Sequence, residues 1–269
     1  MKSLSSKMFI AVSALIAAGS GVSSAAVYTW TGAAGTSAWE TPSNWDLNNG
    51  YYPQSSQDTA IIGNEEGRSY DVVWSMTAQY FGATDAITIH KGSTLSVKAQ
   101  GNDNTGNLAF AELNLYGTFK AENITNALGF ANDFTVNFGD ITQESCGVFD
   151  FSGMTGKLWF NSHKITVTAD ATVSGRGTMT LISFAGNTDA TAAFDTTGIA
   201  VHDAFGESLT LNASAETLDG LAEGEFAVLA RNSGVSIIYN VAAVPEPSSF
   251  GLLAGLGAIA LAVSRRKRR

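Results

Sequence analysis

The amino-acid sequence predicts an all-β protein. Three observations support this class: apolar and polar residues alternate in many short runs, 28 of the 269 residues are glycine, and only 14% of residues are charged. Alternation with a period of two is typical of strands that bury one face, and glycine is typical of the turns between them. A coiled coil contains far more charge, and a disordered acidic chain has far less apolar content than the 45% found here.

The predicted strands follow one another between residues 86 and 241. Gly, Asn, Asp or Ser residues separate them, as expected for tight turns. One stretch, Ser214–Ala222, predicts a short helix with Ser214 at its N-cap. The predicted strands are Ala86–His90, Thr94–Lys98, Glu112–Tyr116, Phe134–Phe138, Val148–Phe151, Lys164–Thr168, Thr178–Phe184, Ser208–Asn212 and Val235–Val241.

Two architectures fit this succession of strands. An irregular β-solenoid, similar to a right-handed parallel β-helix, would stack short strands into rungs around a continuous apolar column. A β-sandwich of the jelly-roll type is the alternative, because the sequence has no strict period. We favour the solenoid, since the strand signals between Ala86 and Thr180 are closely spaced and many corners carry Gly or Asn.

The N-terminal segment, residues 1–26, predicts a secretory signal peptide. Lys2 and Lys7 precede the apolar run Met8–Ala18, and small residues continue to Ala26. A basic region, a short apolar region and a small-residue site are the three parts of such a peptide. We expect export by the Sec route and cleavage by signal peptidase after Ala26. A buried N-terminal helix is the alternative interpretation.

The C-terminal segment, residues 244–269, has three parts in a fixed order. A short motif at 244–249 is followed by the apolar run 250–263 and by a basic cluster at 264–269. We expect the apolar run to form a transmembrane helix. At about 21 Å it is a marginal span for a hydrocarbon core of about 30 Å, so it must borrow flanking residues or thin the bilayer. The basic cluster should stay cytoplasmic because positive charge resists translocation. The motif opens with Val244, Pro245, Glu246 and Pro247, and the basic residues are Arg265, Arg266, Lys267, Arg268 and Arg269.

This segment resembles the PEP-CTERM sorting signal of exported bacterial proteins, with Pro245-Glu246-Pro247 as its signature triplet. The resemblance implies recognition by an exosortase-type membrane protease and cleavage near the triplet. It also implies that an inner-membrane intermediate is delivered to the cell surface or the extracellular matrix. A permanent single-pass anchor is the alternative interpretation.

Charge is distributed unevenly along the chain. The whole sequence carries 15 basic and 24 acidic residues, whereas residues 27–243 carry 8 basic and 23 acidic residues, a net charge of −15. Such a domain stays soluble and repels polyanions. It argues against a nucleic-acid partner, because phosphate binding requires clustered Lys and Arg.

Aromatic residues mark the start of the exported part, residues 27–62. The motif consists of Tyr28-Thr29-Trp30-Thr31-Gly32, Trp39, Ser43-Asn44-Trp45, Pro53 and Asp58–Ile62. It resembles the start of autotransporter-type β-helical passengers and of many PEP-CTERM surface proteins. We interpret the rings as a cap over the first rung of the core. The alternative is a carbohydrate-binding module for cell-envelope polysaccharide, because flat rings stack on sugars. The candidate glycan-binding residues are Trp30, Trp39, Trp45, Tyr51 and Tyr52.

No residue pattern indicates a nucleophile, a phosphate-binding loop or a zinc protease. His90, His163 and His202 are far apart and lie in different sequence contexts. Cys146 has no basic neighbour that would lower its pKa, so we expect an inert thiol, and a lone cysteine cannot form an intrachain disulfide. The loop Gly101–Asn107 lacks the ordered acidic residues of an EF-hand and predicts an Asx-rich turn rather than a calcium site.

Two further activities have weak support. Arg176 is an isolated cation of the kind that a polysaccharide lyase uses as a base, but nothing in the sequence pairs it with acids. The pairs Thr166/Thr168 and Thr178/Thr180 are too few for the regular threonine array of an ice-binding protein. We therefore predict a non-enzymatic, cofactor-free surface protein with a structural or adhesive role.

Overall fold

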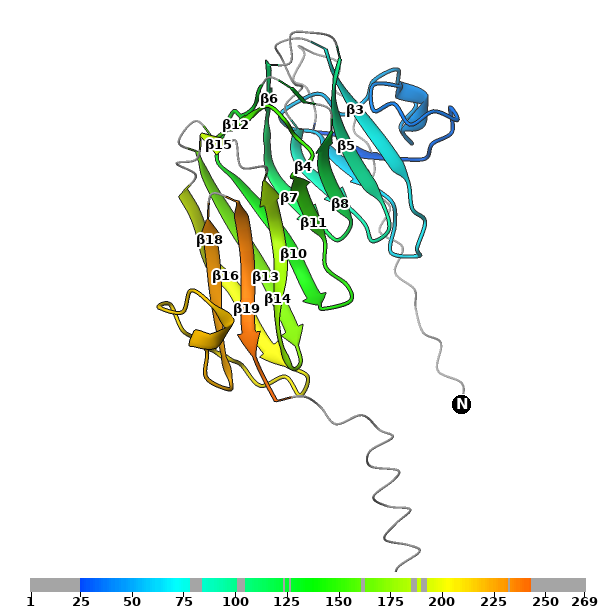
Figure 1. Cartoon of the computed structure of the whole chain (residues 1–269). Coiled ribbons are helices and arrows are strands. Elements are labelled where there is room, and N and C mark those ends of the chain that lie inside the picture. Colours follow the sequence, from blue (N-terminus) through cyan, green and yellow to red (C-terminus); the bar gives the residue numbers. More distant parts are fainter. Residues whose placement is uncertain are drawn as a thin grey trace, which may run out of the picture.

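The computed structural model describes residues 25–77, 84–100, 105–122, 124–125, 127–160, 163–184, 188–189, 193–231 and 233–242. Within these residues the chain consists of β-strands joined by turns, together with two single-turn 3-10 helices, η1 (Pro42–Asn44) and η2 (Leu218–Gly220) (Figure 1). The predicted all-β class is confirmed.

The described strands form three sheets. The first sheet is parallel and has the order β1 (Val27–Thr29), β2 (Thr59–Ile62), β4 (Thr84–Ile89), β7 (Phe110–Leu115), β10 (Phe134–Thr142), β13 (Lys164–Val173), β16 (Ala193–Asp203). The second sheet has the order β17 (Thr210–Leu211), β18 (Glu225–Arg231), β19 (Gly234–Asn240), β14 (Arg176–Phe184), β11 (Val148–Phe151), β8 (Thr118–Glu122), β5 (Thr94–Gln100), β3 (Asp71–Thr77). The third sheet, also parallel, has the order β15 (Thr188–Asp189), β12 (Lys157–Trp159), β9 (Ala127–Phe130), β6 (Thr105–Leu108).

Consecutive strands visit the three sheets in turn. The trios β4-β5-β6, β7-β8-β9, β10-β11-β12 and β13-β14-β15 each place one strand in every sheet. Parallel pairing sets Ile87 beside Leu113, Leu113 beside Val136, and Val136 beside Val167. These matched residues are 26, 23 and 31 positions apart in the chain, which explains why the sequence has no strict period.

Phenylalanine side chains fill much of the core between the sheets. Phe149 packs against Phe119 and Phe151, with ring centroids 5.2 Å and 4.6 Å apart, and Phe130 stacks on Phe160 at 5.5 Å. None of these five rings is more than 1% exposed. Removal of a ring of this size from water contributes roughly 1.5–3 kcal/mol to folding.

Successive trios touch at their corners, where the backbone leaves no room for side chains. A Cβ atom on Gly117 would lie 2.4 Å from the carbonyl oxygen of Ser93, and one on Gly147 would lie 1.8 Å from that of Leu115. Both distances are far below van der Waals contact, so glycine is required at these two corners.

The last part of the chain reverses the strand direction. β19 pairs with β14 and β18 in antiparallel fashion, so a hairpin extends the second sheet at the end remote from β3 (Figure 1). The predicted helix Ser214–Ala222 is wrong, because only the single 3-10 turn η2 forms inside it. The Ser214 hydroxyl donates to Asn212 Oδ1 at 2.8 Å instead of capping a helix, and a turn held in this way competes with helix nucleation.

Each of the predicted strands overlaps a strand of the structure, although only Thr210 and Leu211 of Ser208–Asn212 form a strand, β17. Residues 1–24 of the predicted signal peptide, positions 101–104 of the Asx-rich loop and the tail segment 244–269 lie outside the described residues. Among the residues that are described, no helix is long and apolar enough to cross a membrane.

The phenylalanine core predicts a large cost for truncation. Phe149→Ala should lower the free energy of unfolding by about 3–5 kcal/mol, because the cavity lies between several rings. Phe205→Ala is the matched control, since Phe205 is 78% exposed and its loss should change stability by less than about 0.5 kcal/mol. Urea denaturation measures both changes, and equal midpoints for the two variants would contradict this packing.

Candidate functional site

The tryptophans of the opening motif form a buried cluster at the β3 end of the sheets. Trp39 stacks on Trp74 of β3, with centroids 4.7 Å apart and ring planes 10° apart, and meets Trp45 edge-on at 4.8 Å. Trp30 meets Trp45 edge-on at 5.1 Å. Hydrogen bonds satisfy two of the indoles, because Trp39 Nε1 donates to the Pro53 carbonyl at 3.1 Å and Trp45 Nε1 to the Trp39 carbonyl at 2.8 Å.

Asn44 holds the loop that surrounds these rings, a role that the sequence analysis missed. Its side chain is fully buried. Oδ1 accepts the Ala34 N–H at 3.0 Å, and Nδ2 lies 3.1 Å from the Thr36 carbonyl oxygen and 3.2 Å from that of Ala38. The adjacent Asn44 and Trp45 were the signal available in the sequence. An asparagine amide can hydrogen-bond to the backbone groups of a loop that has no strand pairing to satisfy them.

Burial decides which rings could bind a sugar. Trp30, Trp39 and Trp45 are at most 3% exposed, so they lack the free face that stacking on a sugar requires. Tyr52 is half-buried and packs against the core, whereas Tyr51 is 60% exposed. The predicted glycan-binding set is therefore not available as one surface, because its three tryptophans belong to the core.

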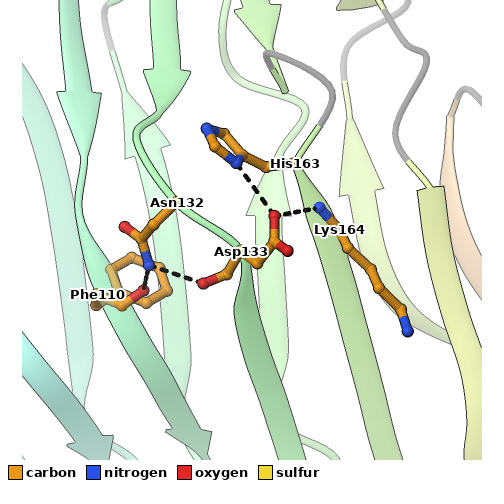
Figure 2. Close-up of polar contacts among 5 residues, drawn as sticks. All are labelled: Phe110, Asn132, Asp133, His163 and Lys164. Carbon is orange, nitrogen blue, oxygen red and sulfur yellow. Dashed lines mark hydrogen bonds and ion pairs between the residues drawn. The ribbon is translucent and has the colours of Figure 1, made fainter.

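His163 takes part in a contact between neighbouring strands of the first sheet. Figure 2 shows His163 and Lys164 converging on Asp133: His163 Nδ1 lies 3.1 Å from Asp133 Oδ1, and the Lys164 N–H donates to the same oxygen at 2.8 Å. The Lys164 N–H and then His163 hold the pKa of Asp133 below its ordinary value. Lys164 Nζ also lies 2.6 Å from Asp195 of β16, so these polar contacts link successive strands.

Next to these contacts, the Asn132 side chain hydrogen-bonds to backbone carbonyls at the starts of two neighbouring strands. Its Nδ2 lies 2.7 Å from the carbonyl oxygen of Phe110 and 2.7 Å from that of Asp133 (Figure 2). The contacts of His163 and Asn132 thus connect the starts of neighbouring strands of the first sheet.

His202 has two partners that the sequence did not indicate. Its Nε2 lies 3.2 Å from Asp170 Oδ1 and its Nδ1 lies 3.2 Å from Ser208 Oγ. A serine, a histidine and an aspartate in this order are the groups of a nucleophilic relay. Asp170 and His202 lie on the outer face of the first sheet and Ser208 lies in the connection after β16, however, and the Asp170 side chain is 55% exposed. Catalysis by such a relay also needs shielding from water and donors for an oxyanion.

The other residues singled out in the sequence, Cys146, Arg176 and His90, are partly buried or contact neighbouring side chains. Burial raises the pKa of the Cys146 thiol to about 11, so the thiolate needed for reactivity is scarce at neutral pH. Arg176 pairs with Asp219 of η2 at 2.5 Å. His90 stacks on Tyr116 with centroids 6.1 Å apart. Within the described ranges, no group of three or more His, Cys, Asp or Glu side chains could hold a metal ion.

A groove of about 510 Å³ lies on the outer face of the second sheet. Strands β14, β18 and β19 contribute its floor and η2 contributes one wall. Hydroxyl side chains and aliphatic side chains line it together with one charged residue, Arg231. The sequence could not indicate this groove, because its lining comes from segments that pair only in the fold.

Comparison with known proteins gives information on the tail alone. The family model of the PEP-CTERM protein-sorting motif matches residues 243–269. This motif supports sorting of an exported bacterial protein by an exosortase-type enzyme, and it confirms the sorting signal expected from the sequence. No curated protein and no solved structure matches the chain. The likeness of residues 27–62 to autotransporter passengers stays a prediction.

The buried amide of Asn44 predicts a cost for its removal. Asn44→Ala should lower the free energy of unfolding by about 2–4 kcal/mol, because three part-buried backbone groups, of Ala34, Thr36 and Ala38, lose their partner. Asn49→Ala is the control, since Asn49 is exposed and its replacement should cost less than about 1 kcal/mol. Thermal unfolding compares the two variants, and an Asn44→Ala protein as stable as the control would contradict the proposed role of the amide.

Proposed function

We propose that this protein is a bacterial surface or extracellular-matrix protein with a structural or adhesive role. An exosortase-type membrane protease releases it from its C-terminal tail. The sorting motif at residues 243–269 is the single observation that carries this proposal. Export and sorting follow from the motif, whereas the role at the surface is inferred from the folded part.

The route of export follows from the two ends of the sequence. Residues 1–26 direct the chain into the Sec pathway, and signal peptidase cleaves after Ala26. The apolar run 250–263 and the basic cluster then hold an inner-membrane intermediate with the folded part outside. Cleavage near Pro245-Glu246-Pro247 frees that part for delivery to the surface.

We further propose that the folded part is an irregular β-solenoid with a buried aromatic cap. Consecutive strands visit three sheets in turn and pair in parallel with the preceding trio, which supports this architecture. A jelly roll would instead contain antiparallel sheets. Crossover connections between parallel strands are right-handed in nearly all proteins, so we assign that hand to the solenoid. The cluster of Trp30, Trp39 and Trp45 supports the cap, because it packs on Trp74 of β3, the strand at the end of the second sheet.

A passive role suits the described surface better than catalysis. The relay of Asp170, His202 and Ser208 lies on an open sheet face, where water competes for every hydrogen bond. The acidic surface, with a net charge of −15 over residues 27–243, keeps the released protein soluble and repels acidic polymers. A structure of stacked parallel strands with this surface supports a structural or adhesive role in the envelope.

Mutation of the signature triplet tests the sorting proposal. Replacement of Pro245, Glu246 and Pro247 by alanine should leave an uncleaved protein in the inner membrane, because the protease no longer recognises its substrate. Intact-mass measurement and cell fractionation detect the change. Replacement of Glu223, an exposed residue of the folded part, by alanine is the control and should leave processing unchanged. A triplet variant with wild-type mass and location would refute sorting through this motif.

The non-enzymatic role is tested at Ser208. A fluorophosphonate, which labels activated serine nucleophiles, should leave the full chain unlabelled, because the relay is open to water. Peptide mass spectrometry detects a label on Ser208 directly. Stoichiometric labelling that disappears in both His202→Ala and Ser208→Ala would show an active nucleophile and overturn this part of the proposal.

A further inference from the structure

We propose that the groove on the outer face of the second sheet binds a unit of a neutral polysaccharide. This inference deepens the proposed adhesive role and rests on the surface location argued above. The groove is bounded by β14, β18, β19 and η2. Its volume of about 510 Å³ lies within the range of small-molecule sites in proteins.

A row of hydroxyl groups forms the polar part of the floor. Thr178 and Thr180 of β14 point outward, because Met179 and Leu181 between and beyond them point into the core. Thr180 is directly opposite Ser236 of β19, and the Ser236 hydroxyl donates to Thr180 Oγ1 at 3.3 Å. Each hydroxyl can donate and accept hydrogen bonds, as the hydroxyl groups of a sugar require.

Aliphatic side chains provide the apolar part of the groove. Leu229 lies on the β18 side and Leu218 on the η2 side, and both are half-buried. Ile238 lies beneath them and is only 3% exposed. Leu218 and Leu229 also pack against a second, smaller core of Ala215, Leu221, Ala227 and Ile238, which fixes the loop around η2 to the sheet. The Asn240 side chain donates to the Leu221 carbonyl at 3.0 Å and strengthens this attachment. The wall is therefore built before a ligand arrives.

Arg231 is the charged residue of the lining. Its Nη2 donates to the Glu216 carbonyl at 2.8 Å, which positions the guanidinium beside the groove. A guanidinium has five N–H donors, so donors remain for the oxygens of a sugar. Within the part of the chain that the structure describes, no carboxylate forms an ion pair with Arg231.

The groove combines hydroxyl groups, aliphatic side chains and the several N–H donors of Arg231. This combination matches a saccharide, whose rings present hydroxyl groups at their edges and apolar C–H faces. The overall charge decides which saccharide. The net charge of −15 over residues 27–243 repels acidic polymers over distances up to about the Debye length of 8–10 Å. One exposed arginine does not offset this repulsion, so a neutral polymer is the ligand that both the lining and the surface charge accept.

Affinity electrophoresis tests this inference with the full chain in a non-ionic detergent. Gels containing dextran, a β-1,3-glucan or xyloglucan should slow the protein, whereas gels with alginate should not. Thr180→Val and Arg231→Gln should each weaken the retention at least fivefold, because each removes hydrogen-bond donors from the groove. Thr166→Val on the first sheet is the matched control and should bind like the wild type. Circular dichroism checks that each variant is folded.

The outcomes separate this inference from the sorting proposal. Retention by a neutral polymer that both groove variants lose supports the site. Three results would overturn it: no retention in any neutral gel, retention unchanged in both groove variants, or retention by alginate that depends on Arg231. Because cleavage and surface delivery are measured independently in cells, a protein that is sorted normally but fails these gels refutes the groove alone.

Discussion

The strands of the stacked trios pair with strands of the neighbouring trios. This pairing fixes the register, and the register in turn decides which side chains enter the core. Ile87, Leu113, Val136 and Val167 line up because their strands pair in parallel. The same register brings the corners of successive trios so close together that Gly117 and Gly147 have no room for a side chain. Core, corners and outer faces all follow from the same pairing.

The ends of such a stack have strand edges and core surfaces without neighbours. At the β3 end the loop around Trp39 and Asn44 covers the core. The Trp39 backbone N–H donates to the carbonyl of Val73 in β3. At the other end the chain reverses and β18 and β19 continue that sheet in the antiparallel sense. The groove lies on the outer face of this antiparallel part of the second sheet.

Local alternation predicted the strands in which one face is buried. Val148–Phe151 is such a segment, and its bounds are those of β11. The method failed where alternation is absent: β9 is buried at all four positions, and β16 contains Gly198 at a break in register with β13. The tail was predictable because its three parts are contiguous in sequence and act as a linear signal.

The candidate site could not be predicted, because its residues meet only in the fold. Thr180 and Ser236 are 56 positions apart and are joined by an antiparallel pairing that interrupts a parallel pattern. His202 likewise meets Asp170 through strand pairing. For the tryptophans, the sequence gives the residue type but not the burial, and burial alone distinguishes a core ring from a ring that can stack on a sugar.

The place where the tail joins the folded part has a mechanical consequence. β19 ends at Asn240 and lies between β14 and β18, and the next backbone bond runs from the Val241 N–H to the Gly175 carbonyl. Tension transmitted through the tail would therefore pull β19 along its own axis. Hydrogen bonds to both neighbours would then be loaded in shear and would have to rupture together, whereas an edge strand peels away one bond at a time. While the chain is tethered, its attachment point is one that resists force.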